Sequence, residues 1–278
     1  MFVSVIISTK NEEKNVENCL QSVLAQNFPR EKMEIIVVDN SSSDNTQSIA
    51  RRYADKVYDI GENVDLSKVK NYRGAQLNFG VDNARGEIIF FPDADMTFQA
   101  DLFSEAAEMF KKCDALYVPE IVRGSGFLGK LRDFERSFYN ETCIDGVRFV
   151  RKKIYHQVGG FDVKNILFGP DDWDFTKMLK KIGATLDITQ KNIFHHEEGM
   201  TWRSYLLKKG KYIPTLEMYV SKWGKNDPDI KKQFSFGYRF FGVFLEKGKW
   251  KKIVRHPFLT AGMFASRFMV GLIYLVKK

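Results

Sequence analysis

Apolar and polar positions alternate along the first 112 residues in blocks typical of strands and helices. The first apolar run, FVSVIIST at 2–9, is rich in Val and Ile, as expected of a buried strand. Asn11 is expected to cap the helix that follows at 11–26, whose apolar stripe is formed by Val16, Cys19, Leu20, Val23 and Leu24. Further strands are predicted at 33–39, 56–60 and 86–93, and further helices at 46–54 and 72–84. Strands that alternate with helices predict a mostly parallel sheet covered by helices, an α/β fold.

The alternation weakens after about residue 113. We expect a strand at 115–120, a helix at 126–141, a strand, helix and glycine turn at 146–162, a helix at 171–183, a pair of strands at 184–188 and 192–196, and a long helix at 201–223. In the helix at 171–183, the residues expected to face inward are Phe175, Met178, Leu179 and Ile182. We therefore predict a domain at 1–223, with halves at 1–112 and 113–223, the second closing over the sheet edge. Residues 224–278 are predicted to form a helical tail.

Polar clusters stand at the carboxyl ends of three predicted strands. They are Thr9-Lys10-Asn11-Glu12, Asp39-Asn40-Ser41 and Asp93-Ala94-Asp95. In a parallel sheet such strand ends lie at one edge, where ligands bind. Two carboxylates one residue apart need a counter-charge, and a hard divalent cation takes oxygen ligands of this kind. Solvated loop carboxylates are the alternative, but the convergence of three clusters on one edge favours a binding site.

Basic residues concentrate near the C-terminal end of this chain of 278 residues, whose formal charge is +8. Between 203 and 278 they are interleaved with Phe234, Phe236, Tyr238, Phe240, Phe241, Phe244 and Trp250. This pattern is typical of surfaces that bind nucleic acid or an anionic membrane. It is also found on solvated basic helices, which remain an alternative.

The segment 258–276 is strongly apolar and 19 residues long, which as a helix gives roughly 28 Å, just under the thickness of a hydrocarbon core. Arg267 stands at its centre, where insertion costs about 2.5–3.5 kcal/mol or more. We therefore expect a helix that lies in the membrane interface, or that packs on its own domain or on a second copy of the chain. Lys277 and Lys278 after it suit anionic headgroups.

The cysteines Cys19, Cys113 and Cys143 are widely spaced and match no metal-ligand pattern. Buried thiols in a reducing compartment are expected. No basic segment with a cleavage site precedes the first strand, so we expect no signal peptide. These features predict a cytoplasmic protein, peripheral to the cytoplasmic membrane face.

Four motifs, in order, resemble the family 2 glycosyltransferases. VSVIISTKNEE is similar to the family's V-S-V-I-I-P-T-Y-N-E-E, with Ser8 and Lys10 replacing the proline and the aromatic residue. EIIVVDNSSSDNT resembles its E-I-I-V-V-D-D-G-S-T-D-G-T, and YRGAQLNFGVDNARGEIIFFPDAD resembles the stretch from R-x-x-Q-x-N-x-G to the metal-binding D-x-D. VGGFD followed by GPDDWDF resembles GGFD and G-x-E-D-x-D-L. The resemblance covers about residues 1 to 210 and implies an inverting transferase with a GT-A fold, here with a helical, basic and aromatic C-terminal extension.

The resemblance implies a nucleotide-sugar-binding half at 1–112 and an acceptor-side half at 113–223. The nucleoside pocket would be lined by Thr9, Asn11, Glu12 and Asp39, with Asp39 accepting from a base N–H. Arg73 and Asn78 would reach the ribose or the phosphates, although Arg73 is alternatively a surface charge. Asp93 would bind the ribose and Asp95 the cation, Mg²⁺ or Mn²⁺, which bridges the two phosphates; Asp93 is also a candidate ligand of that cation.

Asp171 and Asp172 stand where the family has its catalytic Glu-Asp, and Asp172 would be the general base. The alternative is that both carboxylates only favour the helix dipole. The HHEEG segment resembles the family's C-terminal metal histidine. His196 fits the spacing to Gly199 better, and His195 remains the alternative ligand.

The Q-x-x-R-W signature of processive synthases is missing, and TWRSY only superficially resembles it, which predicts one sugar per encounter. The expected partners are a UDP- or GDP-type sugar donor, a lipid-linked or polysaccharide acceptor and an anionic membrane surface, but no nucleic acid. A nucleotidyltransferase would need a glycine- and lysine-rich phosphate loop after the first strand, and STKNEE is not one. A non-catalytic binding protein is the other alternative. It is disfavoured because Asp39, Asp93, Asp95, Asp172 and a histidine are all retained.

Overall fold

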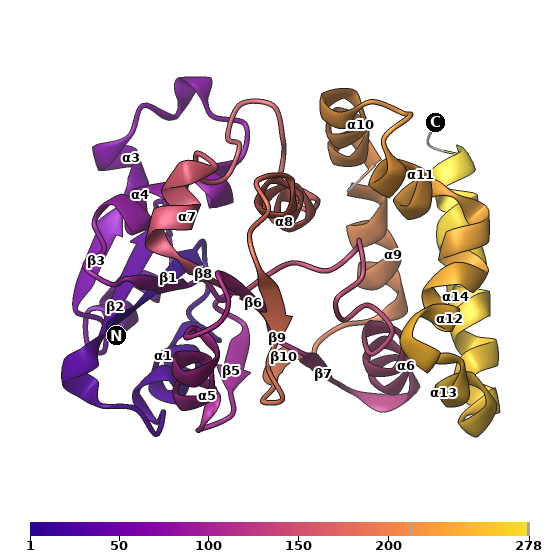
Figure 1. Cartoon of the computed structure of the whole chain (residues 1–278), viewed down its shortest axis with the longest axis horizontal. Coiled ribbons are helices and arrows are strands. Elements are labelled where there is room, and N and C mark those ends of the chain that lie inside the picture. The colour runs from indigo at the N-terminus through magenta and orange to yellow at the C-terminus, as the bar shows by residue number, and fades with distance from the viewer. Residues whose placement is uncertain (212, 277–278) are drawn as a thin grey trace. The chain divides into compact units, whose positions relative to one another are not determined.

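The computed structural model describes residues 1–211 and 213–276, which form two compact units (Figure 1). The first unit consists of Met1–Pro119 and Gly146–His195. The second consists of Glu120–Asp145 and the described residues from His196 onward. The chain therefore leaves the first unit, returns to it, and leaves it again. These boundaries differ from the predicted ones, because residues 224–276 share a unit with 120–145 instead of forming a tail of their own.

The first unit contains a mixed sheet with strand order β3-β2-β1-β4-β8-β6-β9. Its strands are β1 (Val3–Thr9), β2 (Met33–Asp39), β3 (Lys56–Asp59), β4 (Ile88–Phe90), β6 (Ala115–Tyr117), β8 (Phe149–Arg151) and β9 (Leu186–Ile188). All neighbours are parallel except β8, which runs antiparallel to both β4 and β6. The predicted mostly parallel α/β sheet is confirmed.

The strand register brings the predicted polar clusters to one edge. Thr9 pairs with Asp39 at the end of β1 and β2, and Ser8 forms an isolated parallel bridge with Asp93 after β4. The three strand ends therefore lie side by side, as expected of parallel neighbours.

Helices cover both faces of this sheet because side chains alternate between its faces along each strand. Val5 and Ile7 pack with α1 (Val16–Leu24) and α5 (Leu102–Met109), whereas Ile6 packs with α4 (Tyr72–Asp82), α7 (Lys152–Gln157) and α8 (Asp171–Lys181). Gly80 lets α4 lie very close to β1, since a Cβ there would be 2.3 Å from Ile6 Cγ2. The remaining short elements are η1 (Arg30–Lys32), α2 (Thr46–Ala50), α3 (Ile60–Asn63) and η2 (Leu66–Lys68).

Several local predictions were wrong. Asn11 does not cap α1, which begins at Val16 after the N-cap Asn15; Asn11 itself has a left-handed φ of 56°. The segments at 184–188 and 192–196 do not pair with each other. β9 pairs with β6, and β10 (Ile193–Glu197) pairs antiparallel with β5 (Met96–Phe98). Ile182 follows the end of α8 and is exposed, because the helix ends before its stripe reaches this residue.

The second unit is mainly helical. It contains β7 (Glu120–Gly124), α6 (Gly126–Arg136), α9 (Trp202–Lys211), α10 (Ile213–Trp223), α11 (Pro228–Phe234), the π-helix η3 (Tyr238–Gly242), α12 (Val243–Leu245), η4 (Glu246–Gly248), α13 (Trp250–Arg255) and α14 (Pro257–Val276). Phe138 and Phe244 meet edge to face in its core at a centroid distance of 4.8 Å. α14 packs on α6 and α9, and a Cβ at Gly262 would lie 2.8 Å from the Phe127 ring.

Arg267, at the middle of α14, is buried and paired. Its Nε donates to Glu135 Oε1 at 3.2 Å, and a second nitrogen donates to Tyr139 Oη at 2.6 Å. No described helix is long and apolar enough to cross a membrane. The expectation that α14 packs on its own domain is therefore met for the described residues, while Lys277 and Lys278 lie outside them.

Candidate active site

The carboxylate of Asp39 is fully buried at the end of β2. Its Oδ1 accepts from the hydroxyls of Thr9 and Ser42, both at 2.6 Å. Its Oδ2 accepts from the Ser42 amide at 2.7 Å and from Gln47 Nε2 at 2.9 Å. The two carboxylate oxygens offer about four lone-pair sites, and these four hydrogen bonds occupy all of them. A base N–H could bind to Asp39 only by replacing one of these donors.

The loop after β1 is tied to the loop after β2. Asn11 Oδ1 accepts from the Ser43 amide at 2.9 Å, and the Glu12 amide donates to Thr46 Oγ1 at 2.7 Å. Burial raises the pKa of Glu12, and the nearby charges of Asp95 and Asp93 raise it further.

Asp93 is held between two arginines. Arg73 reaches its Oδ1 at 3.0 Å, and Arg148 NH1 lies 3.2 Å from its Oδ2. Burial alone would raise the pKa of Asp93, but the charges of Arg73, Arg148 and His195 outweigh it and hold that pKa well below its usual range. Both oxygens of Asp93 therefore have a cationic partner.

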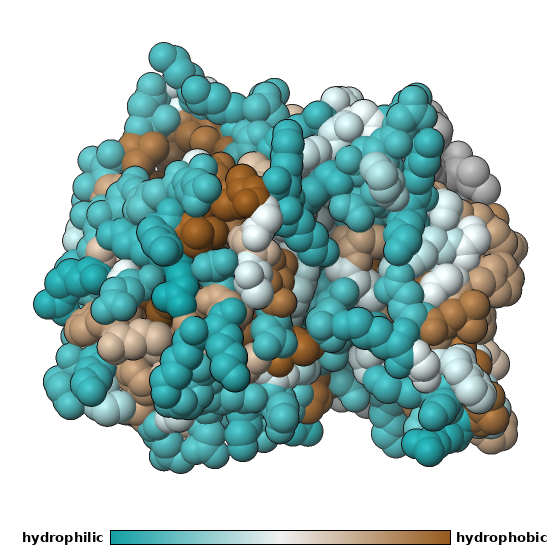
Figure 2. All heavy atoms as spheres, viewed as in Figure 1, coloured by the Kyte–Doolittle hydropathy of each residue, from teal (hydrophilic) through white to brown (hydrophobic). Residues whose placement is uncertain are grey.

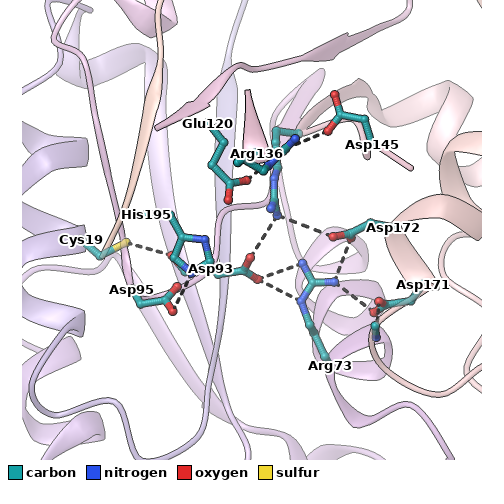
Figure 3. Close-up of polar contacts among 12 residues, drawn as sticks. Cys19, Arg73, Asp93, Asp95, Glu120, Arg136, Asp145, Asp171, Asp172 and His195 are labelled. Carbon is teal, nitrogen blue, oxygen red and sulfur yellow. Dashed lines mark hydrogen bonds and ion pairs between the residues drawn. The ribbon is translucent and has the colours of Figure 1, made fainter. Parts of the chain in front are cut away.

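Asp95 lies beside a histidine. His195 Nε2 is 3.1 Å from Asp95 Oδ2, and Figure 3 shows the two side chains facing each other. The other oxygen, Asp95 Oδ1, is buried and has no hydrogen-bond partner among the described residues. His196 instead places Nδ1 2.9 Å from Glu198 Oε1. The preference for His196 is thus not supported by the structure, because successive strand residues point to opposite sides and the β10–β5 register sets His195 opposite Met96.

A divalent cation fits this pair. An unpartnered buried oxygen on Asp95 and an imidazole nitrogen are donors that Mg²⁺ or Mn²⁺ accepts. The described residues contain no group of three or more His, Cys, Asp or Glu side chains that could hold a metal by themselves. The remaining ligands would have to come from a bound substrate or water.

Asp171 and Asp172 open α8, and their environments differ (Figure 3). Asp171 is buried and accepts from Asn71 Nδ2 at 3.2 Å, Arg73 NH1 at 3.1 Å and the Gly169 amide at 3.0 Å. Burial raises the pKa of Asp171 and the charge of Asp172 adds to this, while Arg73 opposes it. The Asp172 side chain keeps 22% of its surface exposed and lies 3.0 Å from Arg73 NH1 and 3.9 Å from Arg148 NH1. Asp172 is therefore the accessible member of the pair.

Arg73 forms ion pairs with three carboxylates, and we call this arrangement the ion-pair hub. The alternative that Arg73 is only a surface charge is therefore wrong. The Nε and NH2 edge of its guanidinium binds Asp93, and NH1 binds Asp171 and Asp172. A single side chain therefore joins the end of β4 to the start of α8. The bidentate fork of Arg suits this geometry, since it binds planar carboxylates from two directions.

Asn78 is placed differently from the prediction. Its Nδ2 donates to the Phe161 carbonyl at 2.9 Å, and its Oδ1 accepts from Tyr155 Oη at 2.5 Å and from the Phe161 amide at 2.9 Å. These bonds hold the turn at Gly159 and Gly160, whose φ angles are 82° and 70°. Asn78 therefore supports the turn before α8, and its amide is not directed to a ribose or a phosphate.

The sequence reasoning missed Arg148, Asn71 and Gln76. Gln76 is buried and its Nε2 donates to the carbonyls of Val38 and Thr9, at 2.6 and 2.9 Å, which ties α4 to two strand ends. Arg148 precedes β8 and reaches Asp93 because β8 runs antiparallel to β4, with Phe149 opposite Phe90. A basic residue within the apolar stretch VRFV was the available signal, but its partner depends on this register.

The fold is the GT-A fold of glycosyltransferases. The chain belongs to glycosyl transferase family 2, whose model matches residues 4–163, more than half of the sequence.

Individual relatives agree with this assignment. The chain is 24% identical over 284 residues to a dolichyl N-acetyl-alpha-D-glucosaminyl phosphate 3-beta-D-2,3-diacetamido-2,3-dideoxy-beta-D-glucuronosyltransferase of Methanococcus voltae, covering 99% of this chain and 84% of that one. It is 32% identical over 186 residues to the poly(ribitol-phosphate) beta-N-acetylglucosaminyltransferase TarS of Staphylococcus aureus, covering 65% of this chain but only 30% of TarS.

Solved structures show the same fold. The mannosyltransferase PcManGT of Pyrobaculum calidifontis, in complex with GDP-Man and Mn²⁺, superposes with a TM-score of 0.64 at 21% identity, covering 99% of this chain and 85% of that one. TarS residues 1–349 in complex with UDP-GlcNAc give a TM-score of 0.59 at 18% identity, covering 92% of this chain and 79% of that one. At this identity the likeness establishes the fold alone.

Proposed function

We propose that the protein transfers one sugar from a nucleoside diphosphate sugar to an acceptor hydroxyl, with inversion at the transferred carbon. The observation that carries this proposal is the ion-pair hub of Arg73. It joins Asp93, of the motif that would hold the donor, to Asp172, an accessible carboxylate suited to a general base. Donor and base would thus belong to one charge network in the first unit.

In the proposed single displacement, Asp172 takes the proton of the acceptor hydroxyl as its oxygen attacks the anomeric carbon. The bond from that carbon to the phosphate oxygen breaks, and the nucleoside diphosphate leaves with the bonding electrons. Arg73 and Arg148 orient Asp172, and Asp171 holds Arg73 from its buried side. Asp171 is therefore assigned a positioning role.

A divalent cation would be held by Asp95 and His195. When bound, Mg²⁺ or Mn²⁺ supplies positive charge for the departing diphosphate. The buried, unpartnered Oδ1 of Asp95 supports this role, as does the Mn²⁺ in the PcManGT complex. Asp93 would bind the donor's ribose, and Thr9, Asn11, Glu12 and Asp39 would surround its base.

The donor is proposed to be of the UDP or GDP type, since the structural neighbours bind UDP-GlcNAc and GDP-Man. The acceptor is proposed to be a lipid-linked or polymeric glycan, as the names of the Methanococcus and Staphylococcus relatives suggest. A lipid-linked acceptor implies work at a membrane surface, and the free Cys19, Cys113 and Cys143 favour its cytoplasmic face. In this proposal residues 1–112 bind the donor and 113–223 serve the acceptor.

The test combines donor binding with turnover. A thermal-shift panel of UDP-, GDP- and dTDP-sugars with Mn²⁺ should reveal the donor as the compound that raises the melting temperature. Asp172→Asn should keep that shift but lose about 10²–10⁴-fold in transfer. Asp82→Asn, which changes an exposed carboxylate at the end of α4, is the matched control and should transfer normally.

The products separate this reaction from nucleotidyl transfer. Glycosyl transfer releases a nucleoside diphosphate, whereas nucleotidyl transfer would leave the nucleotide on the acceptor. If no donor shifts the melting temperature, or if Asp172→Asn transfers at the wild-type rate, the proposal fails.

A further inference from the structure

The second unit sorts the apolar residues of its C-terminal segment into two groups. Tyr238, Val243 and Phe244 are buried in the core. Another set stays between 49% and 85% exposed and recurs every four or five residues: Phe241, Leu245, Trp250, Val254 and Phe258. We call this set the apolar row. Five large apolar side chains exposed within one short segment are a candidate interaction surface.

The apolar row consists of two pairs on separate short helices, with the non-helical Lys247 between them, and of Phe258. Phe241 and Leu245 are four residues apart across η3 and α12, and Trp250 and Val254 are four apart on α13, so each pair lies on one helical face. Phe258 follows at the start of α14. Figure 2 shows hydrophobic atoms over α12 and α13 next to hydrophilic ones.

A basic stripe runs beside the row. Lys251 and Arg255 directly follow Trp250 and Val254, are exposed, and form no ion pair with the described part of the chain. The other nearby lysines have partners, since Lys249 and Lys252 donate to carbonyls just after α6. α13 therefore presents adjacent apolar and cationic stripes, the arrangement of a helix that lies in a membrane interface.

We infer that the apolar row and the stripe of Lys251 and Arg255 form a docking surface for an anionic lipid bilayer. Trp250, Val254 and Phe258 enter the boundary between headgroups and acyl chains, and the two cations contact lipid phosphates. This deepens the proposed membrane-presented acceptor, although lipid binding itself does not depend on sugar transfer.

The charge pattern favours lipid over a second copy of the chain. A symmetric dimer would place the same surface on both sides of the interface, so each copy would bring its own two cations to it. Like charges across an interface oppose association, whereas anionic headgroups neutralise them. The buried Arg267 also anchors α14 to α6, so only the first turn of α14, with Phe258, would enter the boundary of the bilayer.

The test is co-sedimentation of the full chain with vesicles of phosphatidylcholine, with and without phosphatidylglycerol, at physiological salt. The wild type should bind only the anionic vesicles. The double variant Lys251→Gln/Arg255→Gln should bind about 25-fold more weakly, at about fivefold per cation. The triple variant Trp250→Ser/Val254→Ser/Phe258→Ser should lose at least about 100-fold.

Leu207→Ser is the matched control, because Leu207 is an exposed apolar residue of the same unit on α9, outside the row. It should bind like the wild type. Equal melting temperatures will show that every variant is folded, and an unchanged donor thermal shift keeps the outcome separate from the proposed function. The inference is overturned if the wild type ignores anionic vesicles, or if the variants bind like the wild type. It is also overturned if light scattering shows that the triple variant only dissociates a dimer.

Discussion

Replacing Arg73 with methionine removes the charge that joins three carboxylates while nearly conserving the volume of the side chain. Arg73 lies 3.0 Å from Asp93 and Asp172 and 3.1 Å from Asp171. Arg148 still reaches Asp93 and, more distantly, Asp172. Asp171 is the most affected, because it is buried and loses the charged partner that opposes its burial.

The magnitude follows from these contacts. At 3.0 Å and an effective dielectric constant of about 20, each pair is worth about 5 kcal/mol before desolvation is subtracted. Removing one partner of a buried pair costs a net of about 3–5 kcal/mol. Since Arg73 is 20% exposed, we take the lower end, about 3 kcal/mol, which lowers the melting temperature of a chain this size by roughly 6–12 °C.

The pH dependence has a definite sign. The pKa of Asp171 is already raised by burial, and loss of Arg73 raises it further. An acid whose folded pKa is raised costs stability above its unfolded pKa, and that cost disappears once the group is protonated in both states. The difference in melting temperature between wild type and Arg73→Met should therefore be largest near pH 7 and narrow below about pH 4.

Stability is measured by differential scanning fluorimetry near pH 7 and below about pH 4. Donor binding is measured by calorimetry, and sugar transfer by the release of nucleoside diphosphate. Arg73→Lys should recover part of the stability but little transfer, because an ammonium keeps the charge without the fork. Arg52→Met, at an exposed arginine, is the control. The role assigned to Arg73 would be refuted if Arg73→Met were as stable as the wild type. It would also be refuted if the difference in melting temperature between the two proteins did not change with pH.

Two further predictions concern the histidines and the anchor of α14. His195→Ala should weaken Mn²⁺ binding and transfer about 10- to 100-fold, whereas His196→Ala should stay near wild type; a Mn²⁺ titration of the thermal shift with nucleoside diphosphate present compares them. Arg267→Met should lower the free energy of unfolding in urea by about 3–5 kcal/mol, because the buried charge of Glu135 loses one of its cationic partners. The double variant Arg267→Met/Glu135→Gln should recover much of the lost stability. Burial alone would raise the pKa of Glu135, but the charges of Arg267 and Arg132 outweigh it and lower this pKa to about 2. The stability that Glu135 contributes is therefore present above about pH 4.5 and is lost as the pH falls toward 2. Glu135→Gln should flatten that part of the stability curve, and an unchanged curve would contradict the assignment.

Much of the fold was readable from the sequence because it depends on local patterns. Short Val- and Ile-rich runs predicted β1 to β4, and their alternation with helices predicted a mostly parallel sheet. Because parallel strands end at one edge, the same reading brought Thr9, Asp39 and Asp93 together, and the register confirms this. The order of the motifs was enough to indicate the family.

Helix boundaries and strand partners were less predictable. Asn11 is a residue type common at helix N-caps, but here its backbone has a left-handed φ. Its side chain accepts a hydrogen bond from the loop after β2. β5 and β7 were not anticipated. The position of Arg267 in the sequence indicates that a free membrane span is unfavourable, but its partner Glu135 lies 132 residues away and could not be predicted.

The fold class, the family and the set of carboxylates at the sheet edge could be inferred from the sequence, because they follow from periodicity and from the order of the motifs. Which of these side chains meet depends on strand pairing in three dimensions. The β10–β5 register placed His195 rather than His196 beside Asp95, and the antiparallel β8 brought Arg148 to Asp93. A shift of one residue reverses the side of a strand on which a side chain lies, and such a shift leaves no trace in composition or spacing.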